Sequence, residues 1–328
     1  MTAVLSPALG NPPVVRAHLA CATAFVTVAF AVTVALPLAT YTTSLALFGL
    51  AHVLSELTYI DRRFGAHLSS MALAIGTPIL IAVVARAAAI GGLLPPAIDA
   101  VVELGAAAML AAAAAWRMRR YRALGVLVGL VLGAGAAVAP FQMLLGLAIL
   151  HNLTPLGFFA EALGGERRRR ALILLAIPLV VLPLLIATGL PYEALARAGV
   201  GWPEARFLAS GPLAFNLGVY VPASFISSEW ALHAFSAAVF AQIMHYAAVI
   251  LLLPRLADEN PGRRLWPWRR RGVALGSAAA VVLAVFFFVD YGLARQLYGL
   301  AALVHSWVEI PVLLVALGGI AGAQYAKA

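Results

Sequence analysis

Charged residues and cysteine are both scarce in this chain of 328 residues, and their scarcity excludes whole classes of protein. Only 11% of the residues are charged and 63% are hydrophobic, with a mean hydropathy of +0.98. Soluble globular domains do not have this composition, so the chain is expected to be an integral membrane protein. The single cysteine, Cys21, excludes an intramolecular disulfide and a cysteine-ligated zinc site.

The formal net charge of +9 comes from short arginine clusters that lie between apolar segments. In a membrane protein such clusters mark the cytoplasmic loops, so they give no reason to expect a nucleic-acid partner. The expected partners are the lipid bilayer and a lipophilic small molecule, and the sequence leaves the oligomeric state open. The first apolar segment is too long for a cleavable signal peptide, and no small-residue cleavage site follows it, so we expect none.

Ten apolar segments are long enough to cross a bilayer as helices, which takes about 20 residues each. They predict an all-α, polytopic transmembrane bundle in which residues 1–328 form a single domain. The predicted segments are 15–40, 43–60, 68–92, 96–117, 122–139, 141–163, 171–190, 230–255, 272–291 and 297–322. Two of them are separated only by a tight turn at Pro140.

Every strongly basic loop follows an even-numbered segment. The arginines concerned are Arg62 and Arg63, then Arg117, Arg119, Arg120 and Arg122, then Arg167 to Arg170, and finally Arg255, Arg263, Arg264 and Arg269 to Arg271. Basic loops stay in the cytoplasm, so both termini should be cytoplasmic in a multi-pass inner (plasma) membrane protein of bacterial type. The long apolar loop 191–229 is then extracytoplasmic. We interpret it as a lid, with a short amphipathic helix near 192–198.

Four histidines lie inside even-numbered segments, which all run in the same direction: His52, His151, His245 and His305. Three of them lie about eight to ten residues into their segments, which places them at one depth in the outer half of the membrane. His245 lies deeper, unless its helix begins after Trp230. Ionisable residues inside a bilayer are costly, so four at one depth predict a shared metal site, which the sequence leaves open to one ion or two. The other histidines, His18, His67 and His233, are expected outside this centre.

Two of these histidines begin the motif His-x-x-x-Glu, which Glu56 and Glu309 complete. Residues four apart share one helix face, so each glutamate could be a further ligand, a proton carrier or a group that orients an imidazole. Tyr246 is a third candidate catalytic residue, and Gln242, Asn152, Thr154 and Ser55 could supply hydrogen bonds. Imidazole and carboxylate suit iron, copper, zinc or manganese. The lack of thiolate ligands favours non-haem iron and oxygen chemistry.

Three other interpretations remain open from these residues alone. The histidines could be axial ligands of a haem, or the His and Glu side chains could relay protons or metal ions in a transporter. They could also only hydrogen-bond helices together. Among the remaining charged residues, Asp290 could pair with Arg86 or Arg295.

The segment Gly49–Glu56, which reads GLAHVLSE, resembles a motif of the Brp/Blh family of membrane β-carotene 15,15'-dioxygenases. That motif is Gly-Leu-Pro-His followed four residues later by aspartate, so Ala51 and Glu56 depart from it. The segment Ile149–Asn152 is similar to a later histidine motif of the family, while residues 68–150 contain no histidine for its second motif. The resemblance implies a polytopic fold, iron bound by histidines of several helices, and oxygen-dependent oxidation or cleavage of a lipophilic substrate, a carotenoid in that family.

Overall fold

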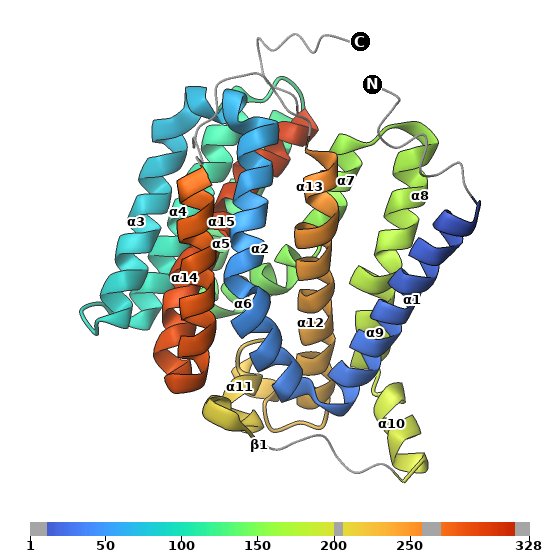
Figure 1. The fold of residues 1–328 in the computed structure, drawn as a ribbon. Helices are drawn as coiled ribbons and strands as arrows, with labels where there is room; N and C mark the ends of the chain where they lie inside the picture. The colour runs from blue at the N-terminus through green and yellow to red at the C-terminus, as the bar shows by residue number, and fades with distance from the viewer. Residues whose placement is uncertain (1–11, 200–205, 258–269, 319–328) are drawn as a thin grey trace.

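A computed structural model describes residues 12–199, 206–257 and 270–318, which are helical except for one short strand pair (Figure 1). The helices are α1 (Pro12–Ala35), α2 (Pro37–Leu68), α3 (Ala72–Ile90), α4 (Pro96–Arg117), α5 (Arg122–Val138), α6 (Pro140–His151), α7 (Thr154–Ala162), α8 (Gly165–Ala176), α9 (Leu182–Ala187), α10 (Leu190–Arg197), α11 (Leu213–Leu217), α12 (Trp230–Ala247), α13 (Leu253–Leu256), α14 (Arg270–Val289) and α15 (Tyr291–Gly318). Strands β1 (Arg206–Phe207) and β2 (Gly211–Pro212) pair antiparallel. Short 3-10 turns cover Ser69–Met71, Leu208–Ser210 and Ala223–Phe225, and π-helical turns cover Ile177–Val181 and Ala248–Leu252.

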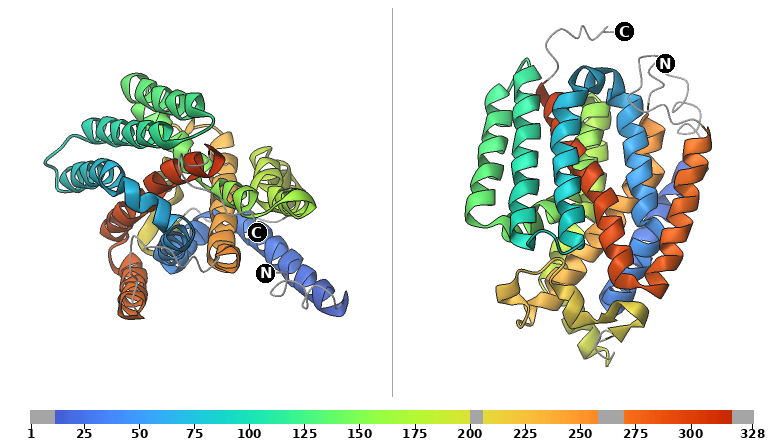
Figure 2. Two further views of the ribbon diagram at one scale, coloured as in Figure 1. Left: turned by 90° about the horizontal axis from the view of Figure 1, so that it is seen from above. Right: turned by 90° about the vertical axis from the view of Figure 1, so that its left-hand side faces the viewer.

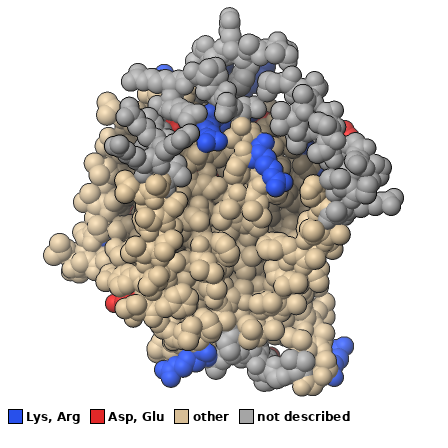
Figure 3. Space-filling model, in the orientation of Figure 1, with Lys and Arg blue, Asp and Glu red and all other residues tan. Residues whose placement is uncertain are grey.

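The polytopic helical bundle predicted from the sequence is confirmed. Among the described residues, seven helical spans are long and apolar enough to cross a membrane, or eight if the bent pair α6–α7 counts as one. Helix α5 and the apolar stretch Ala274–Val289 of α14 are shorter, so the ten predicted segments correspond to these eight spans and two short helices. Large apolar side chains cover the outside, with Leu73 85% and Val138 84% exposed. On the face shown in Figure 3, the visible charged residues lie mostly toward the two ends, and the middle is apolar, which suits lipid.

Helices α2, α12 and α15 lie at the centre of the bundle, with α3–α5 on one side and α1, α8 and α9 on the other (Figures 1 and 2). The four histidine-bearing helices, α2, α6, α12 and α15, run in the same direction, as predicted (Figure 1). Helix α1 begins and α15 ends at the same end of the bundle. The predicted cytoplasmic termini and part of the fourth basic loop fall on 1–11, 319–328 and 258–269, outside the described residues.

Proline determines two helix breaks. Helix α5 ends at Val138 and α6 begins at Pro140, which confirms the predicted turn there. The prediction of one continuous helix over 141–163 was wrong, because α6 ends at His151 and α7 continues at an angle of 46°. Pro155 has no backbone N–H, so the carbonyl of His151 cannot accept its helical hydrogen bond. The Thr154 hydroxyl lies 2.9 Å from that carbonyl oxygen and donates to it instead.

The described part of the predicted lid lies across one end of the bundle. It contains α10, close to the short helix expected at 192–198, and α11, whereas residues 200–205 are outside the described ranges. Leu217, Tyr220 and Val221 pack with Tyr41 and Phe235 of the bundle. The interpretation of this segment as a lid stays a prediction.

Arg86, Asp99 and Glu103 form an ion cluster between α3 and α4, which differs from the pairing suggested by the sequence. Arg86 of α3 pairs with Asp99 at 2.7 Å and with Glu103 at 2.6 Å, both on α4. Asp290 is exposed and accepts a hydrogen bond from the backbone N–H of Leu293 at the start of α15. The predicted pairing of Asp290 with Arg86 or Arg295 was therefore wrong. The short turn between α3 and α4 places oppositely charged residues beside each other, and these satisfy Arg86.

Candidate metal centre

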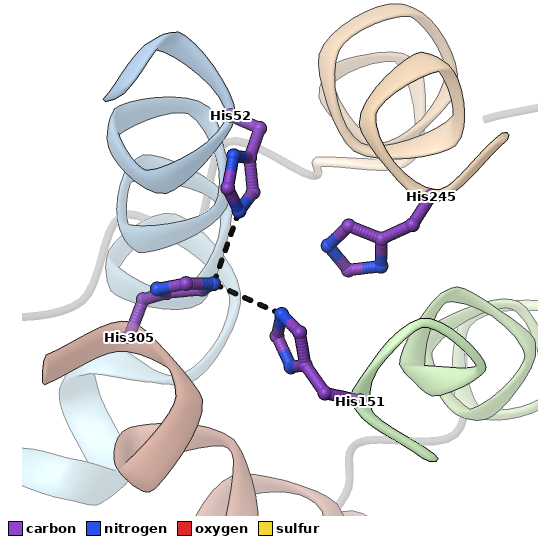
Figure 4. Close-up of side chains that lie close together, drawn as sticks. All are labelled: His52, His151, His245 and His305. Carbon is purple, nitrogen blue, oxygen red and sulfur yellow. Dashed lines mark hydrogen bonds between the residues drawn. The ribbon is translucent and has the colours of Figure 1, made fainter. Parts of the chain in front are cut away.

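The four histidines predicted as metal ligands come together at one place in the bundle (Figure 4). Each offers one ring nitrogen to a group in which all four atoms lie within 4.8 Å of one another. His52, His245 and His305 are at most 1% exposed, and the His151 side chain is 16% exposed. The helices' shared direction and the convergence of their side chains establish the adjacency that the sequence left open. A buried four-histidine cluster of this kind could hold a metal ion.

The first residues of the observed helices explain why the histidines lie at one depth better than the predicted segment starts do. Helix α2 begins at Pro37 rather than at 43, so His52 lies 15 residues beyond its start. His245 also lies 15 residues beyond the start of its helix at Trp230, and His305 lies 14 beyond Tyr291. The alternative that the helix of His245 begins after Trp230 is excluded, because α12 begins at that residue. Nearly equal numbers of residues bring these three side chains to one level.

His305 occupies the middle of the cluster. Its Nε2 lies 3.1 Å from Nε2 of His52 and 3.0 Å from Nε2 of His151 (Figure 4). His245 approaches from the other side, with its ring centroid 4.6 Å from that of His151 and 5.4 Å from that of His52. Neither ring nitrogen of His245 has a hydrogen-bond partner within the described parts of the chain. Buried nitrogens without partners are costly, and a metal ion would satisfy one of these two.

Glu309 contacts the ring nitrogen of His151 that does not face His305. Its Oε2 lies 2.7 Å from Nδ1 of His151, and its Oε1 lies 2.8 Å from the Thr154 hydroxyl. This is the arrangement in which a carboxylate fixes the tautomer and orientation of a metal-binding imidazole, because Nδ1–H donates and Nε2 is left free. The break between α6 and α7 contributes, since it brings Thr154 close to both His151 and Glu309.

Glu56 has a different environment from Glu309. It is fully buried, and neither of its oxygens has a hydrogen-bond partner in the described ranges. Its Oε2 lies 3.8 Å from Nε2 of His245. Glu56, His151 and Glu309 also form a group whose ligand atoms lie within 4.8 Å of one another. Two carboxylates this close repel when both are ionised, so a proton or a cation belongs between them.

Tyr246 lies against the centre, and a second tyrosine that the sequence analysis missed supports it. The Tyr246 ring stacks on His52 at a centroid distance of 4.1 Å, and its hydroxyl lies 3.2 Å from that of Tyr298. Tyr298 precedes His305 by seven residues, or two helical turns, and this spacing could have revealed it. Gly49 makes room for it, because a Cβ there would lie 2.9 Å from the Tyr298 ring.

Two other polar candidates, Ser55 and Asn152, form their hydrogen bonds with backbone carbonyls. Ser55 donates to the carbonyl of Val249 in the π-helical turn after α12, and Asn152 donates to carbonyls of its own helix. His233 stacks on Tyr192, away from the cluster, and His18 is exposed. These two histidines lie outside the centre, as predicted. Nothing is described of the side chain of His67.

A cavity of about 810 Å³ reaches the centre. His52, His151, His305 and Glu309 line one part of it, and leucines of α6 and α15 line another. Its volume lies within the range of about 300–1,000 Å³ common for small-molecule sites. Leu150 of α6 borders the cavity and is 59% exposed on the apolar outer surface.

Comparison with protein-family models, with curated proteins and with solved structures finds no match to this chain. The chemistry of the site therefore has to be argued from its own residues.

Replacing Glu309 by glutamine should weaken metal binding about 10- to 100-fold, the usual effect of losing a carboxylate behind a ligating histidine. Glutamine keeps an acceptor for Nδ1 of His151 but removes the negative charge that makes the imidazole a better donor. Competition with a chelator would measure the affinity. The matched control is Glu193→Gln, whose carboxylate lies on the exposed helix α10. Equal affinities for the two variants would contradict the orienting role of Glu309.

Proposed function

We propose that this protein is an intramembrane metalloenzyme in which His52, His151, His245 and His305 bind one non-haem iron ion. Bound iron would supply the activation of dioxygen for the oxidation or cleavage of a lipophilic substrate. The observation that carries the proposal is the convergence of four imidazoles, three of which line a partly apolar cavity.

The ligand type supports iron, one of the metals that imidazole suits. Four histidines on a six-coordinate iron ion would leave two positions for oxygen or substrate, whereas a four-coordinate zinc ion would have none. Haem iron takes only two axial ligands from protein, fewer than the four that converge here.

Each protein group then has a role. Glu309 and Thr154 orient His151, and Tyr246 supports the ring of His52 from one face. Glu56, whose oxygens have no other partner, is placed to act as a further ligand or to hold a proton beside the ion. The exposure of Leu150 at the edge of the cavity supports lateral entry of the substrate from the membrane.

The proposal extends to the membrane topology and to the Brp/Blh-like motifs. All ten helical segments would span an inner membrane, with both termini in the cytoplasm and residues 191–229 as an extracytoplasmic lid. His52 and His151, the two residues of the Brp/Blh-like motifs, are both in the cluster, which supports histidine-ligated iron. We propose a lipophilic substrate and not a carotenoid in particular, because neither short motif contains a residue that would recognise a carotenoid.

One observation favours a second candidate, a transporter of protons or metal ions. The helix pair α6–α7 is broken at His151, and discontinuous helices often form the binding sites of transporters. Uptake of Zn²⁺ or Fe²⁺ into vesicles containing the purified protein would favour this function over the enzyme.

The test of the enzyme proposal is elemental analysis of the purified protein, followed by nitric oxide added to the reduced sample. Nitric oxide occupies the position that dioxygen would take. We expect iron without a Soret band, and an EPR signal of a high-spin iron–nitrosyl. Zinc alone, a Soret band, or iron that does not bind nitric oxide would each contradict the proposal.

A further inference from the structure

Arg295 lies in the wall of the cavity that reaches the histidines. It is on α15, ten residues before His305, which corresponds to roughly 15 Å along the helix. Its side chain is half-buried beside the phenol groups of Tyr41, Tyr291 and Tyr220. A guanidinium keeps its charge at any physiological pH, so the cavity contains a permanent positive charge near one end.

Within residues 12–199, 206–257 and 270–318, no carboxylate lies within ion-pair distance of Arg295. Other arginines of the same ranges are paired: Arg63 with Glu161 at 2.9 Å, and Arg197 with Glu193 at 3.1 Å. The nearby Asp290 accepts a hydrogen bond from the backbone at the start of α15. The tyrosine hydroxyls beside Arg295 are neutral and leave its charge uncompensated. A half-buried guanidinium in this state is stabilised by an anion.

A second group in the same wall has a donor without an acceptor. Gln242 is 3% exposed and lines the cavity, and its Oε1 accepts a hydrogen bond from the Tyr220 hydroxyl. Its Nε2 has no hydrogen-bond partner among the described residues. The cavity wall therefore contains a guanidinium without a countercharge and an amide donor without an acceptor, and both suit the oxygens of an anion.

Elsewhere the wall of the cavity contains apolar side chains, which are Leu144 and Leu147 of α6 and Leu303, Ile310 and Leu313 of α15. Arg86 and Glu103 also line the cavity, but they pair with each other at 2.6 Å. A ligand that suits Arg295, Gln242 and the apolar lining has a charged head and an apolar chain. We propose that the cavity binds a single-chain amphipathic anion, with a carboxylate or phosphate head on Arg295 and Gln242 and its chain toward the histidines. The proposal rests on the proposed function, since it gives the substrate of the metal centre its class.

The test is equilibrium binding of three radiolabelled probes to the full-length protein in nonionic detergent: palmitate, hexadecyl phosphate and hexadecanol. We expect saturable binding of at least one anion and at least tenfold weaker binding of the neutral alcohol. Arg295→Gln should weaken anion binding at least tenfold, a loss that corresponds to one charge-assisted contact. Arg295→Lys should retain most of the affinity. The matched control is Arg197→Gln, which removes an exposed arginine and should leave binding unchanged.

The two anions identify the head group, because preference for palmitate assigns a carboxylate and preference for hexadecyl phosphate assigns a phosphate. If Arg295→Gln does not fold, Gln242→Leu takes its place, with an expected several-fold loss. Equal binding of hexadecanol and the anions, no binding of any probe, or unchanged anion binding in Arg295→Gln or in its replacement would overturn the proposal. Metal content is measured on the same samples. Loss of anion binding with full metal content supports the anion site, whereas retention of metal by a His305→Ala variant would contradict only the proposed function.

Discussion

His305→Ala should reduce the metal content from about one ion per chain to less than about a tenth, since even changes behind the ligands cost 10- to 100-fold in affinity. His305 is the residue with the largest effect because its Nε2 lies within 3.1 Å of both His52 and His151. Its loss removes one ligand and also the contact that holds two others in place. Elemental analysis of protein purified without added metal would measure the change.

Two other histidines provide the controls for this prediction. His233→Ala removes a histidine that stacks on Tyr192 outside the cluster, and His18→Ala removes an exposed one. Both variants should keep the metal content of the unaltered protein. A His305→Ala variant that folds and keeps its full metal content would show that the four histidines only hold the helices together.

Arg86→Leu should destabilise the protein by about 3 kcal/mol, the lower end of the range for breaking a buried ion pair. The side chains of Asp99 and Glu103 are 7% and 4% exposed, so both would be left in an apolar environment without a countercharge. The lower end applies because Arg86 itself is 31% exposed and partly solvated. Unfolding of the purified protein by a denaturing detergent in mixed micelles would give the free-energy difference.

A variant in which Arg86, Asp99 and Glu103 are all neutral distinguishes the effect of unpaired charge on stability from the effect of lost packing. Adding Asp99→Asn and Glu103→Gln to Arg86→Leu removes all three charges and should restore most of the stability. Arg197→Leu, which breaks an exposed pair, should change stability by less than about 0.5 kcal/mol. A triple variant as unstable as Arg86→Leu would contradict the electrostatic explanation.

Much of the bundle could be predicted because lipid imposes one simple rule, that each span is a long apolar helix. The rule located the long apolar segments and the turn at Pro140, where the backbone N–H is missing. It missed the break after His151, since Pro155 lies inside an apolar run and many membrane helices tolerate proline. It also placed the start of α2 at 43, because the polar Thr40, Thr42 and Thr43 interrupt the run although Thr42 is buried.

The four histidines of the candidate centre were predictable, because burying an ionisable side chain in a membrane is unfavourable and needs a reason. The residues that hydrogen-bond to them were not predictable. Four histidines at similar offsets in parallel helices pointed to one depth, and the structure brings them together. The different environments of Glu56 and Glu309 could not be read from identical His-x-x-x-Glu motifs, because the difference comes from Thr154 and His151 of another helix. The isolation of Arg295 was hidden for the same reason, since Asp290 is close in sequence but turned toward its own helix start.

The most direct test of the central claim is X-ray absorption spectroscopy at the metal edge of the purified, unaltered protein. The arrangement of His52, His151, His245 and His305 predicts nitrogen and oxygen neighbours at about 2.1 Å and strong outer-shell scattering from several imidazoles. A first shell containing sulfur, a porphyrin scattering pattern, or a metal without imidazole neighbours would contradict it.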